Sequence, residues 1–545
     1  MIRVGGPSDP NATKIAVIGS SSDLRGRVFR VIDDMGAVVL TGHLKRAPRT
    51  ARAPQTGPLP WRYAETADLS ALTTPGNYRV RVGRMTSLPW QIYDGAAADL
   101  RDALLAFYPI ANDGNEFSPV HGVSHLHDAR LVTNDAMDIR NGQDFDLTGG
   151  WMDAGDPDKW VFTIGFATWA LEAGARLEPS VTGLQSTADV GLRWLLKMHP
   201  PGSTLFVGQV GNASWERDNF GFRDPSTDDS NAEQEVNHRR AYETKRSDVA
   251  GKAAAALALA STLTTAEDEA QELAAAKEWY ALGKTNATAA SDPSCNDSED
   301  TCTYDDSTWT DDMALAAAEL YNATHTQSYL DDAYSYLADA GAYVGAGPDG
   351  YTTDPYAAAE LCGALGGAAI GTTEQIGTAC GDLSEDAGIA QSRMQNVFLR
   401  PSENDIATSC RNAAEGVIAA AATRNGNTEA ETVAANARDY ILGRNPWGLS
   451  FVVGFSAPST QHPYHWLQEP SARDPIEEPN GWLVPGPTSL ANFRSFGGNY
   501  TAAHGRFDTR FLGYADNHGL FHYNEGDVAC QANGVLLAVL LDLAG

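Results

Sequence analysis

Ala-rich stretches with helical periodicity recur along most of this 545-residue chain, from about residue 94 to its end. Each such helix has an apolar face that another element must cover. Long polar, Gly-rich loops separate the stretches, and no short sequence repeat indicates a solenoid. The pattern predicts a mainly α domain, a closed toroid of paired helices with its loops gathered at one end. The stretches lie at about residues 162–177, 184–198, 247–263, 266–282, 311–323, 328–341, 355–369, 411–424, 429–442 and 528–543.

Residues 1 to about 95 follow a different pattern, of short β-type runs broken by Pro, Gly and Ser/Asp clusters. This spacing predicts a small β-sandwich. We therefore expect two domains, a β-sandwich over 1–95 and a helical domain over 96–545. The runs begin at Lys14, Arg27, Gly36 and Asn77.

The charge balance excludes several classes of partner. The chain has 39 basic and 70 acidic residues and a formal net charge of −31. Such a charge repels phosphate backbones and anionic lipid, so we expect neither nucleic acid nor membrane as a partner. No run reaches the roughly eighteen apolar residues of a membrane helix, and the first residues lack the apolar core of a signal peptide. We expect a soluble monomer, secreted after trimming or else cytoplasmic.

The six Cys residues fall into two groups. Cys295 and Cys302 flank a short segment rich in Asp, Ser and Asn, where a local disulfide would suit an oxidising compartment. The others lie in or near apolar helical sequence, where buried structural thiols are the simpler expectation, and the sequence alone does not pair them. These four are Cys362, Cys380, Cys410 and Cys530.

Two acidic segments stand directly before predicted helices. The segment from Gly149 to Trp160 places Asp153 and Asp156 three residues apart in a Gly-flanked turn. The segment Tyr523-Asn-Glu-Gly-Asp527 opens the last apolar helix. Each segment could be no more than a helix cap with an acidic first turn. Each could equally supply carboxylates for acid–base chemistry.

With two further motifs, these segments resemble glycoside hydrolase family 9, the inverting β-glucanases and cellulases. The stretch from Gly149 to Asp156 resembles the family's catalytic-base motif, and Asn524-Glu525 matches its catalytic-acid pair. The segments 247–261 and 440–455 are similar to its Ser-Asp-Val-Ala helix and its Leu-Gly-Arg-Asn-Pro stretch. The resemblance implies an (α/α)6 barrel preceded by an immunoglobulin-like β-sandwich.

The resemblance also implies a division of roles among the carboxyl groups. Asp156 would activate water, Asp153 would help to hold that water, and Glu525 would protonate the leaving oxygen. Inverting glycosidases place such groups about 6.5–9.5 Å apart. Glu525 would have to stay protonated, which a partly desolvated setting among aromatic side chains and substrate could provide. No metal or organic cofactor enters the reaction, and the expected substrate is a β-1,4-linked glucan, cellulose-like or of mixed linkage.

One departure from the family bears on the substrate. Where the family usually has His-Pro-His-His-Arg, this chain has His462-Pro-Tyr-His-Trp466, so the glycan need not be plain cellulose. Alternatives are an exo-acting β-glucosidase or cellodextrinase, a glucosaminidase-type enzyme, or a catalytically silent glycan-binding relative. Aromatic side chains stack on pyranose rings, although ordinary packing is the competing explanation. The candidate substrate-binding residues are His462, Tyr464, His465, Trp466, Trp309 and Trp447.

Two segments resemble the family's calcium site. They supply hydroxyl, carbonyl and carboxylate oxygens, which suit Ca²⁺, although an acidic helix start would look the same. We therefore expect that calcium, if it binds, has a structural and not a catalytic role. The candidate ligands are Ser307, Thr308, Asp311, Asp312 and Asp354.

Relatives with an immunoglobulin-like module often bind zinc through Cys and His. Here Ser124 stands where a Cys is expected, so we do not expect a closed Cys/His zinc site. His121, His125 and His127 could still gather around a metal or a sugar.

Overall fold

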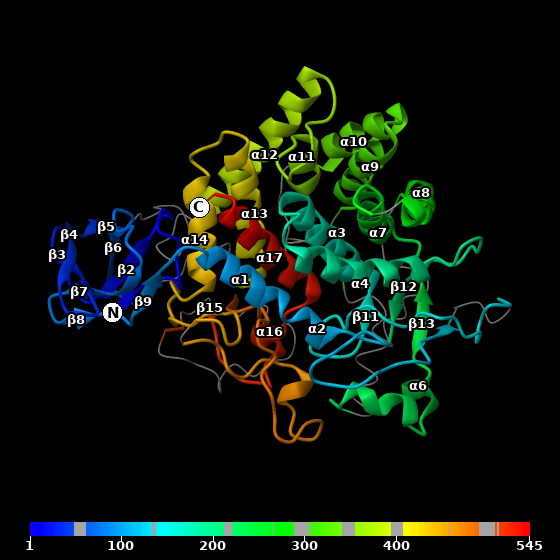
Figure 1. Ribbon diagram of the computed structural model, residues 1–545, viewed down its shortest axis with the longest axis horizontal. Coiled ribbons are helices and arrows are strands. Elements are labelled where there is room, and N and C mark those ends of the chain that lie inside the picture. Colours follow the sequence, from blue (N-terminus) through cyan, green and yellow to red (C-terminus); the bar gives the residue numbers. More distant parts are fainter. Residues whose placement is uncertain are drawn as a thin grey trace.

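The computed structural model describes residues 1–47, 61–132, 138–211, 221–264, 266–287, 304, 306, 308–340, 355–393, 407–456, 458–489, 507–508 and 512–544. An N-terminal module of two sheets lies beside a large helical domain (Figure 1). The prediction of a β-sandwich followed by an (α/α)6 barrel is confirmed.

The N-terminal module consists of two antiparallel sheets. Alternating apolar residues of the strands point between them, so that Ile18, Val31 and Val80 are fully buried. One sheet has the order β1 (Ile2–Arg3), β2 (Ile15–Ser20), β6 (Tyr63–Asp68) and β5 (Lys45–Arg46). The other has the order β4 (Val38–His43), β3 (Val28–Asp33), β7 (Gly76–Val82) and β8 (Met85–Thr86), with β9 (Trp90–Ile92) also on β7.

Helices of the second domain form two concentric rings. Each inner helix packs against the next until the ring closes, and each outer helix packs behind an inner one. The inner ring is α17 (Val528–Asp542), α3 (Val161–Leu177), α7 (Ser247–Ala260), α9 (Thr310–Thr324), α11 (Pro355–Leu361) and α13 (Thr408–Arg424). The outer helices are α1 (Ala96–Leu105), α4 (Thr182–Met198), α8 (Ala266–Asn286), α10 (Gln327–Ala340), α12 (Thr373–Arg393) and α14 (Glu431–Ile441).

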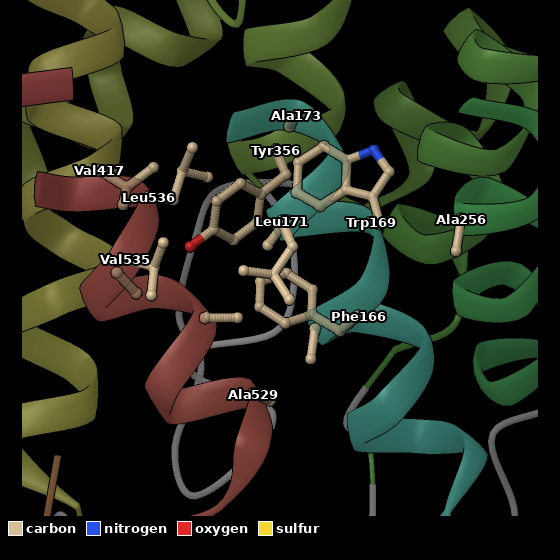
Figure 2. Packing of buried hydrophobic residues seen from close by; sticks show 14 of the residues in the cluster. Phe166, Trp169, Leu171, Ala173, Ala256, Tyr356, Val417, Ala529, Val535 and Leu536 are labelled. Atoms are coloured by element: carbon tan, nitrogen blue, oxygen red, sulfur yellow. The ribbon is translucent and has the colours of Figure 1, made fainter. Parts of the chain in front are cut away.

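The two rings differ in sequence for a physical reason. All residues of α7 are buried, and its many Ala side chains let α3 and α9 approach closely. In α4, by contrast, burial follows one face from Leu184 to Met198. Large side chains fill the middle of the barrel, among them Phe166, Trp169 and Tyr356 (Figure 2).

Smaller elements connect the rings at the end where the inner helices begin. A four-stranded sheet has the order β10 (Arg130–Val132), β13 (Arg240–Glu243), β12 (Val207–Val210) and β11 (Lys159–Trp160). The others are α2 (Tyr108–Ala111), α6 (Gln234–Asn237), α16 (Phe521–Asn524), the pair β14 (Thr488–Ser489) and β15 (Leu512–Gly513), and two 3-10 helices, Pro225–Ser230 and Trp466–Gln468.

The helix predicted over 355–369 is wrong in its extent. It ends at Leu361, and Gly363 follows with a φ of 74°, a left-handed conformation that ends helices. The next helix, α12, was not predicted, because its sequence is mostly polar and contains Gly, although its buried Ala379, Leu383, Ala387 and Ala390 recur at helical spacing.

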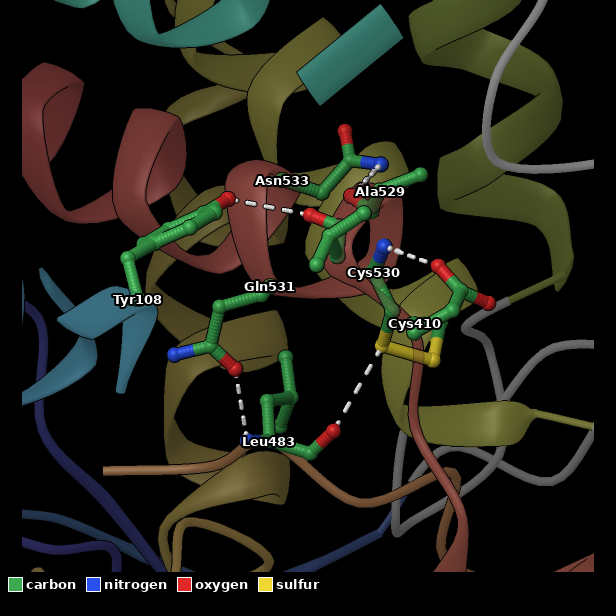
Figure 3. The surroundings of a disulfide bond; sticks show 9 residues. Tyr108, Cys410, Leu483, Ala529, Cys530, Gln531 and Asn533 are labelled. Carbon is green, nitrogen blue, oxygen red and sulfur yellow. Dashed lines mark hydrogen bonds between the residues drawn. A yellow bond between two sulfur atoms is a disulfide. The ribbon is translucent and has the colours of Figure 1, made fainter. Parts of the chain in front are cut away.

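The expectation of unpaired thiols is also wrong. Cys362 is bonded to Cys380, and Cys410 to Cys530, with Cα atoms 5.1 and 4.8 Å apart. The second bridge joins the first turns of α13 and α17 (Figure 3). Only the ring packing brings these two turns together, across 120 residues of sequence. The Cys295–Cys302 segment lies outside the described residues.

Polar contacts join the module to the barrel. The Asp9 carboxylate accepts hydrogen bonds from the backbone N–H groups of Gly95, Ala96 and Ala97, where α1 begins. Arg3 donates to the carbonyls of Pro446 and Trp447 at 3.0 and 2.8 Å. Among the described helices, none combines the length and apolar character needed to cross a membrane.

A buried carboxyl group lies near the C-terminal end of α3. Glu172 is fully buried, and neither of its carboxyl oxygens has a hydrogen-bond partner in the described part of the chain. Burial raises the pKa of Glu172 well above its ordinary value, and the carboxylates of Glu272 and Glu319 add to the rise. At pH values above the ordinary carboxyl pKa, the folded protein thus binds a proton that the unfolded chain releases. The free energy of unfolding therefore falls as the pH rises.

Replacing Glu172 by Met should remove the free-energy cost of burying an unpaired carboxyl group. We expect the free energy of unfolding at pH 7.5 to rise by about 1–3 kcal/mol. This gain should shrink as the pH falls toward the ordinary pKa of a carboxyl group. Urea denaturation at several pH values measures it, with exposed Glu374→Met as the control. A variant less stable than the wild type at pH 7.5 would contradict the prediction.

Candidate active site

The loop before α3 holds Asp153 in a buried setting. Asp153 is 2% exposed, and the hydroxyls of Thr163 and Tyr304 each donate to one of its carboxyl oxygens. Its backbone carbonyl accepts from Val528 N–H at 3.0 Å, which ties the loop to the start of α17. Burial raises the pKa of Asp153 well above its ordinary value, and the nearby Asp527 carboxylate adds to the rise.

Asp156 lies in the same loop but is only partly buried. Its Oδ1 accepts a hydrogen bond from the Asp158 N–H at 3.1 Å, an Asx turn that fixes the carboxylate relative to the backbone. The two Asp side chains therefore differ in environment, with Asp153 enclosed by hydroxyl donors and Asp156 nearer to solvent.

Glu525 meets this loop from the other side. The N–H of Gly155 donates to Glu525 Oε1 at 3.3 Å, so Glu525 and Asp156 flank one glycine. A Cβ at Gly155 would lie 2.0 Å from the carbonyl oxygen of Tyr464, which only glycine avoids. Asn524 is buried and donates to three carbonyl oxygens, those of Ala515, Asn517 and Leu520, which hold the backbone beside Glu525.

The segment 462–466 contacts both loops, the one with Gly155 and the one with Asn524. Tyr464 N–H donates to Asn524 O at 3.0 Å, and Trp466 N–H donates to Gly155 O at 3.2 Å. His462 is exposed and Tyr464 partly exposed, with its ring 5.6 Å from that of His518. His465 and Trp466 are 1% and 2% exposed, so their side chains pack inside the protein behind this segment. Burial lowers the pKa of His465 to about 3.

The other two candidate stacking residues lie on separate elements. Trp309 stands directly before α9, with its ring edge-on to that of Tyr336 of α10, 5.5 Å away. Trp447 donates from Nε1 to Asp508 at 2.9 Å. Both are partly exposed.

The described part of the predicted calcium site consists of Thr308, Asp311 and Asp312, since Ser307 and Asp354 lie outside the described residues. Both Asp side chains are buried in the first turn of α9. Asp312 Oδ2 is 2.7 Å from the Lys252 ammonium, which also contacts Asp306 at 2.9 Å. A lysine cation therefore already neutralises part of this acidic group.

The three histidines of the 121–127 segment do not gather. His127 stacks on His238, and the edge of His121 faces the ring of Trp466. His125 instead joins Asp113 and Asp128, and ligand atoms of these three buried residues lie within 4.8 Å of one another, a spacing compatible with a metal. Burial and Arg239 oppose a charge on His125, but the carboxylates of Asp113 and Asp228 raise its pKa to about 9.

Several residues of this region were missed by the sequence analysis. Tyr304 and Thr163 hold Asp153, while Lys159 and Arg239 contact the Asp113–Asp128 pair. Lys159 lies three residues after Asp156, where the motif that resembles the family's catalytic-base motif ends, and this proximity was the one available signal. Thr163, Tyr304 and Arg239 belong to no motif that the sequence made visible, and Tyr304 and Arg239 are far in sequence from the residues they contact.

Two loops, each preceding one of two adjacent inner helices, thus bring a pair of carboxyl groups to the rim of an (α/α)6 barrel. This fold and this pair define a glycoside hydrolase. The chain belongs to glycosyl hydrolase family 9, whose family model matches residues 98–540. The model of the cellulase N-terminal ig-like domain matches residues 9–87. Enzymes of this family hydrolyse β-1,4-glucans with inversion and without a cofactor.

Known proteins resemble the chain over nearly its whole length. A xyloglucan-specific endo-β-1,4-glucanase from Bacteroides ovatus is 25% identical, over 97% of this chain and 92% of that protein. The crystal structure of a metagenome-derived family 9 endoglucanase superposes with a TM-score of 0.80 at 23% identity, over 99% of both chains. A Zn-binding triple mutant of endoglucanase J30 superposes with a TM-score of 0.78 at 22% identity, over 98% of this chain and 99% of that one.

Proposed function

We propose that Asp156 is the catalytic base, Glu525 the catalytic acid and Asp153 a residue that holds the attacking water. The observation that carries this assignment is that Glu525 accepts a hydrogen bond from the N–H of Gly155, the residue directly before Asp156. Asp153 has each carboxyl oxygen engaged by a hydroxyl donor and is nearly fully buried, which suits a supporting role. Asp156 is the more open of the two and is the better placed to take a proton from water.

The proposed reaction is a single displacement. Glu525 donates its proton to the glycosidic oxygen as the bond from that oxygen to the anomeric carbon breaks. Asp156 takes a proton from water, whose oxygen attacks the same carbon from the opposite face. The reaction leaves Glu525 ionised and Asp156 protonated, and proton exchange with solvent restores both groups. A β-linked glucan therefore releases an α-anomer first.

For the substrate, we propose a β-1,4-glucan of the cellulose or mixed-linkage type, cleaved internally. Xyloglucan is a further candidate, because the relative from Bacteroides ovatus is named for it. The partly exposed Tyr464 beside Glu525 would stack on a sugar ring, and exposed His462 would contact its hydroxyls. Trp309 and Trp447 remain proposed as more distant contacts. The burial of His465 and Trp466 favours a packing role for both.

Product analysis tests this proposal directly. Proton NMR of a fresh hydrolysate should show the α-anomer first, before mutarotation equalises the anomers. Reactions on cellulose, mixed-linkage glucan, xyloglucan, chitosan oligomers and aryl-β-glucosides, read by product size, separate internal from terminal cleavage. An initial β-anomer would overturn the role of Asp156. A chain that binds glucans but releases no product would be a silent relative.

We also propose a structural calcium ion at the start of α9 and an extracellular location. Asp311 and Asp312 would bind the ion, and elemental analysis of the purified protein tests this. Two disulfides in the described residues support an oxidising compartment. We keep 95/96 as the proposed domain boundary and a monomer as the proposed state.

A further inference from the structure

A buried ion cluster lies next to the loop that carries Asp153 and Asp156, which we call the catalytic loop. We call it the Lys159 cluster, and it consists of Asp113, His125, Asp128, Lys159 and Arg239. All five side chains are fully buried, and they come from segments up to 126 residues apart. Three of them have the spacing of a metal site, so the first question is whether a metal fits.

Two cations already occupy the carboxylates of the cluster. The Lys159 ammonium is 2.8 Å from Asp113 Oδ2 and 2.7 Å from Asp128 Oδ2. Arg239 donates from Nε and Nη2 to the two oxygens of Asp128, at 2.9 and 2.6 Å. A buried divalent ion would have to share these oxygens with two fixed positive charges, which is electrostatically unfavourable.

The histidine of the cluster is not oriented as a ligand. His125 Nδ1 is 2.7 Å from Asp113 Oδ1, and its Nε2 is 3.0 Å from Asp228 Oδ2. Carboxylate oxygens only accept hydrogen bonds, so both ring nitrogens must carry protons. An imidazole with two N–H groups has no lone pair to offer to a metal. The residues present therefore do not fit a metal site.

The Lys159 cluster also holds both ends of the catalytic loop. Before the loop, Lys159 donates to Gly149 O at 3.0 Å, and Asp113 N–H donates to Gly150 O at 2.9 Å. After the loop, Arg239 Nη1 donates to Pro157 O at 2.5 Å. The segment that carries Asp153 and Asp156 is thus held on one side by Lys159 and the Asp113 backbone and on the other by Arg239.

We propose that Lys159 and Arg239 take the place of a metal ion in this cluster, and that both are positioning residues for the Asp153–Asp156 loop. The positioning role rests on the proposed assignment of Asp156 as the base. Misplacing a reacting group by about 1 Å can cost about 100-fold in rate. The cluster thus contributes to kcat without touching the substrate.

Lys159→Met tests the positioning role. We expect kcat to fall about 100-fold with KM nearly unchanged. Arg176→Met is the matched control, because Arg176 also forms a largely buried ion pair, with Glu360, but near the C-terminal ends of the inner helices. The control should lose stability and keep kcat.

If Lys159→Met does not fold, the milder Arg239→Lys, which keeps the charge and loses the contact to Pro157, should lower kcat about 10-fold with KM nearly unchanged. Unchanged kcat in the folded variant would overturn the positioning role.

Metal analysis of the wild type tests whether Lys159 and Arg239 take the place of a metal ion. Protein prepared in zinc-containing buffer should hold far less than one transition-metal ion per chain. Its melting temperature should not respond to zinc or to 1,10-phenanthroline, with calcium present throughout. One bound ion per chain whose removal lowers the melting temperature would overturn the proposal. Failure of the proposed function is distinguishable, since Asp156→Asn would then leave turnover intact, whatever the cluster does.

Discussion

Replacing Glu525 by Gln should lower kcat on soluble β-glucan by about three to four orders of magnitude, while glucan binding is retained. Gln keeps the shape and can still accept the Gly155 N–H, which donates to Glu525 Oε1 at 3.3 Å, but it cannot protonate the leaving oxygen. General acid catalysis is worth about 10²–10⁴-fold in such reactions. Steady-state kinetics and affinity electrophoresis measure the two effects. Glu477→Gln, at a carboxylate paired with Arg473, is the control and should stay close to the wild type.

The two Asp residues should respond differently to the same change. Asp156→Asn should abolish measurable turnover, because it removes the proposed base, and the carboxyl oxygens of the buried Asp153 are both engaged by hydroxyl donors. Asp153→Asn should leave a trace, because Asp156 could still polarise a less firmly held water. If Asp153→Asn proved the more damaging, the two roles should be exchanged, and the inverting mechanism would stand.

Removing the Cys410–Cys530 bridge should produce the largest loss of stability. The bridge closes a loop of 120 residues, and chain entropy assigns such a closure roughly 4–5 kcal/mol. Cys530 lies in the first turn of α17, where its N–H donates to Asp527 Oδ1 at 2.7 Å and its sulfur contacts the carbonyl of Leu483 (Figure 3). The double Ala variant keeps the N–H, so kcat below the melting transition should change little.

The second bridge provides the matched comparison. Cys362 and Cys380 are 18 residues apart, and a loop of that size is worth about 3 kcal/mol. Denaturant unfolding of the two double Ala variants should therefore show the larger loss for Cys410 and Cys530. Equal losses, or no loss, would contradict the loop-entropy argument.

The sequence by itself determined most of the helices and indicated the carboxyl groups that we propose as catalytic. Helices depend on local periodicity, so most of the inner and outer helices agree with the predicted stretches to within a few residues. The carboxyl groups belong to short contiguous motifs, Gly149–Asp156 and Asn524–Glu525, which local reasoning and resemblance can recognise. The exceptions are α11, which ends at Leu361, and α12, whose mostly polar sequence packs against α11 and α13.

Only the tertiary structure decided which distant residues meet. The hydroxyl of Tyr304 reaches Asp153 across 151 residues, and Arg239 reaches Asp113 across 126. Burial was equally invisible, since nothing in the sequence distinguishes the buried His465 and Trp466 from the partly exposed Tyr464 next to them in the chain. Pairing and burial depend on how the rings close and how the loops cover them. These are properties of the whole packed chain, and no window of the sequence contains them.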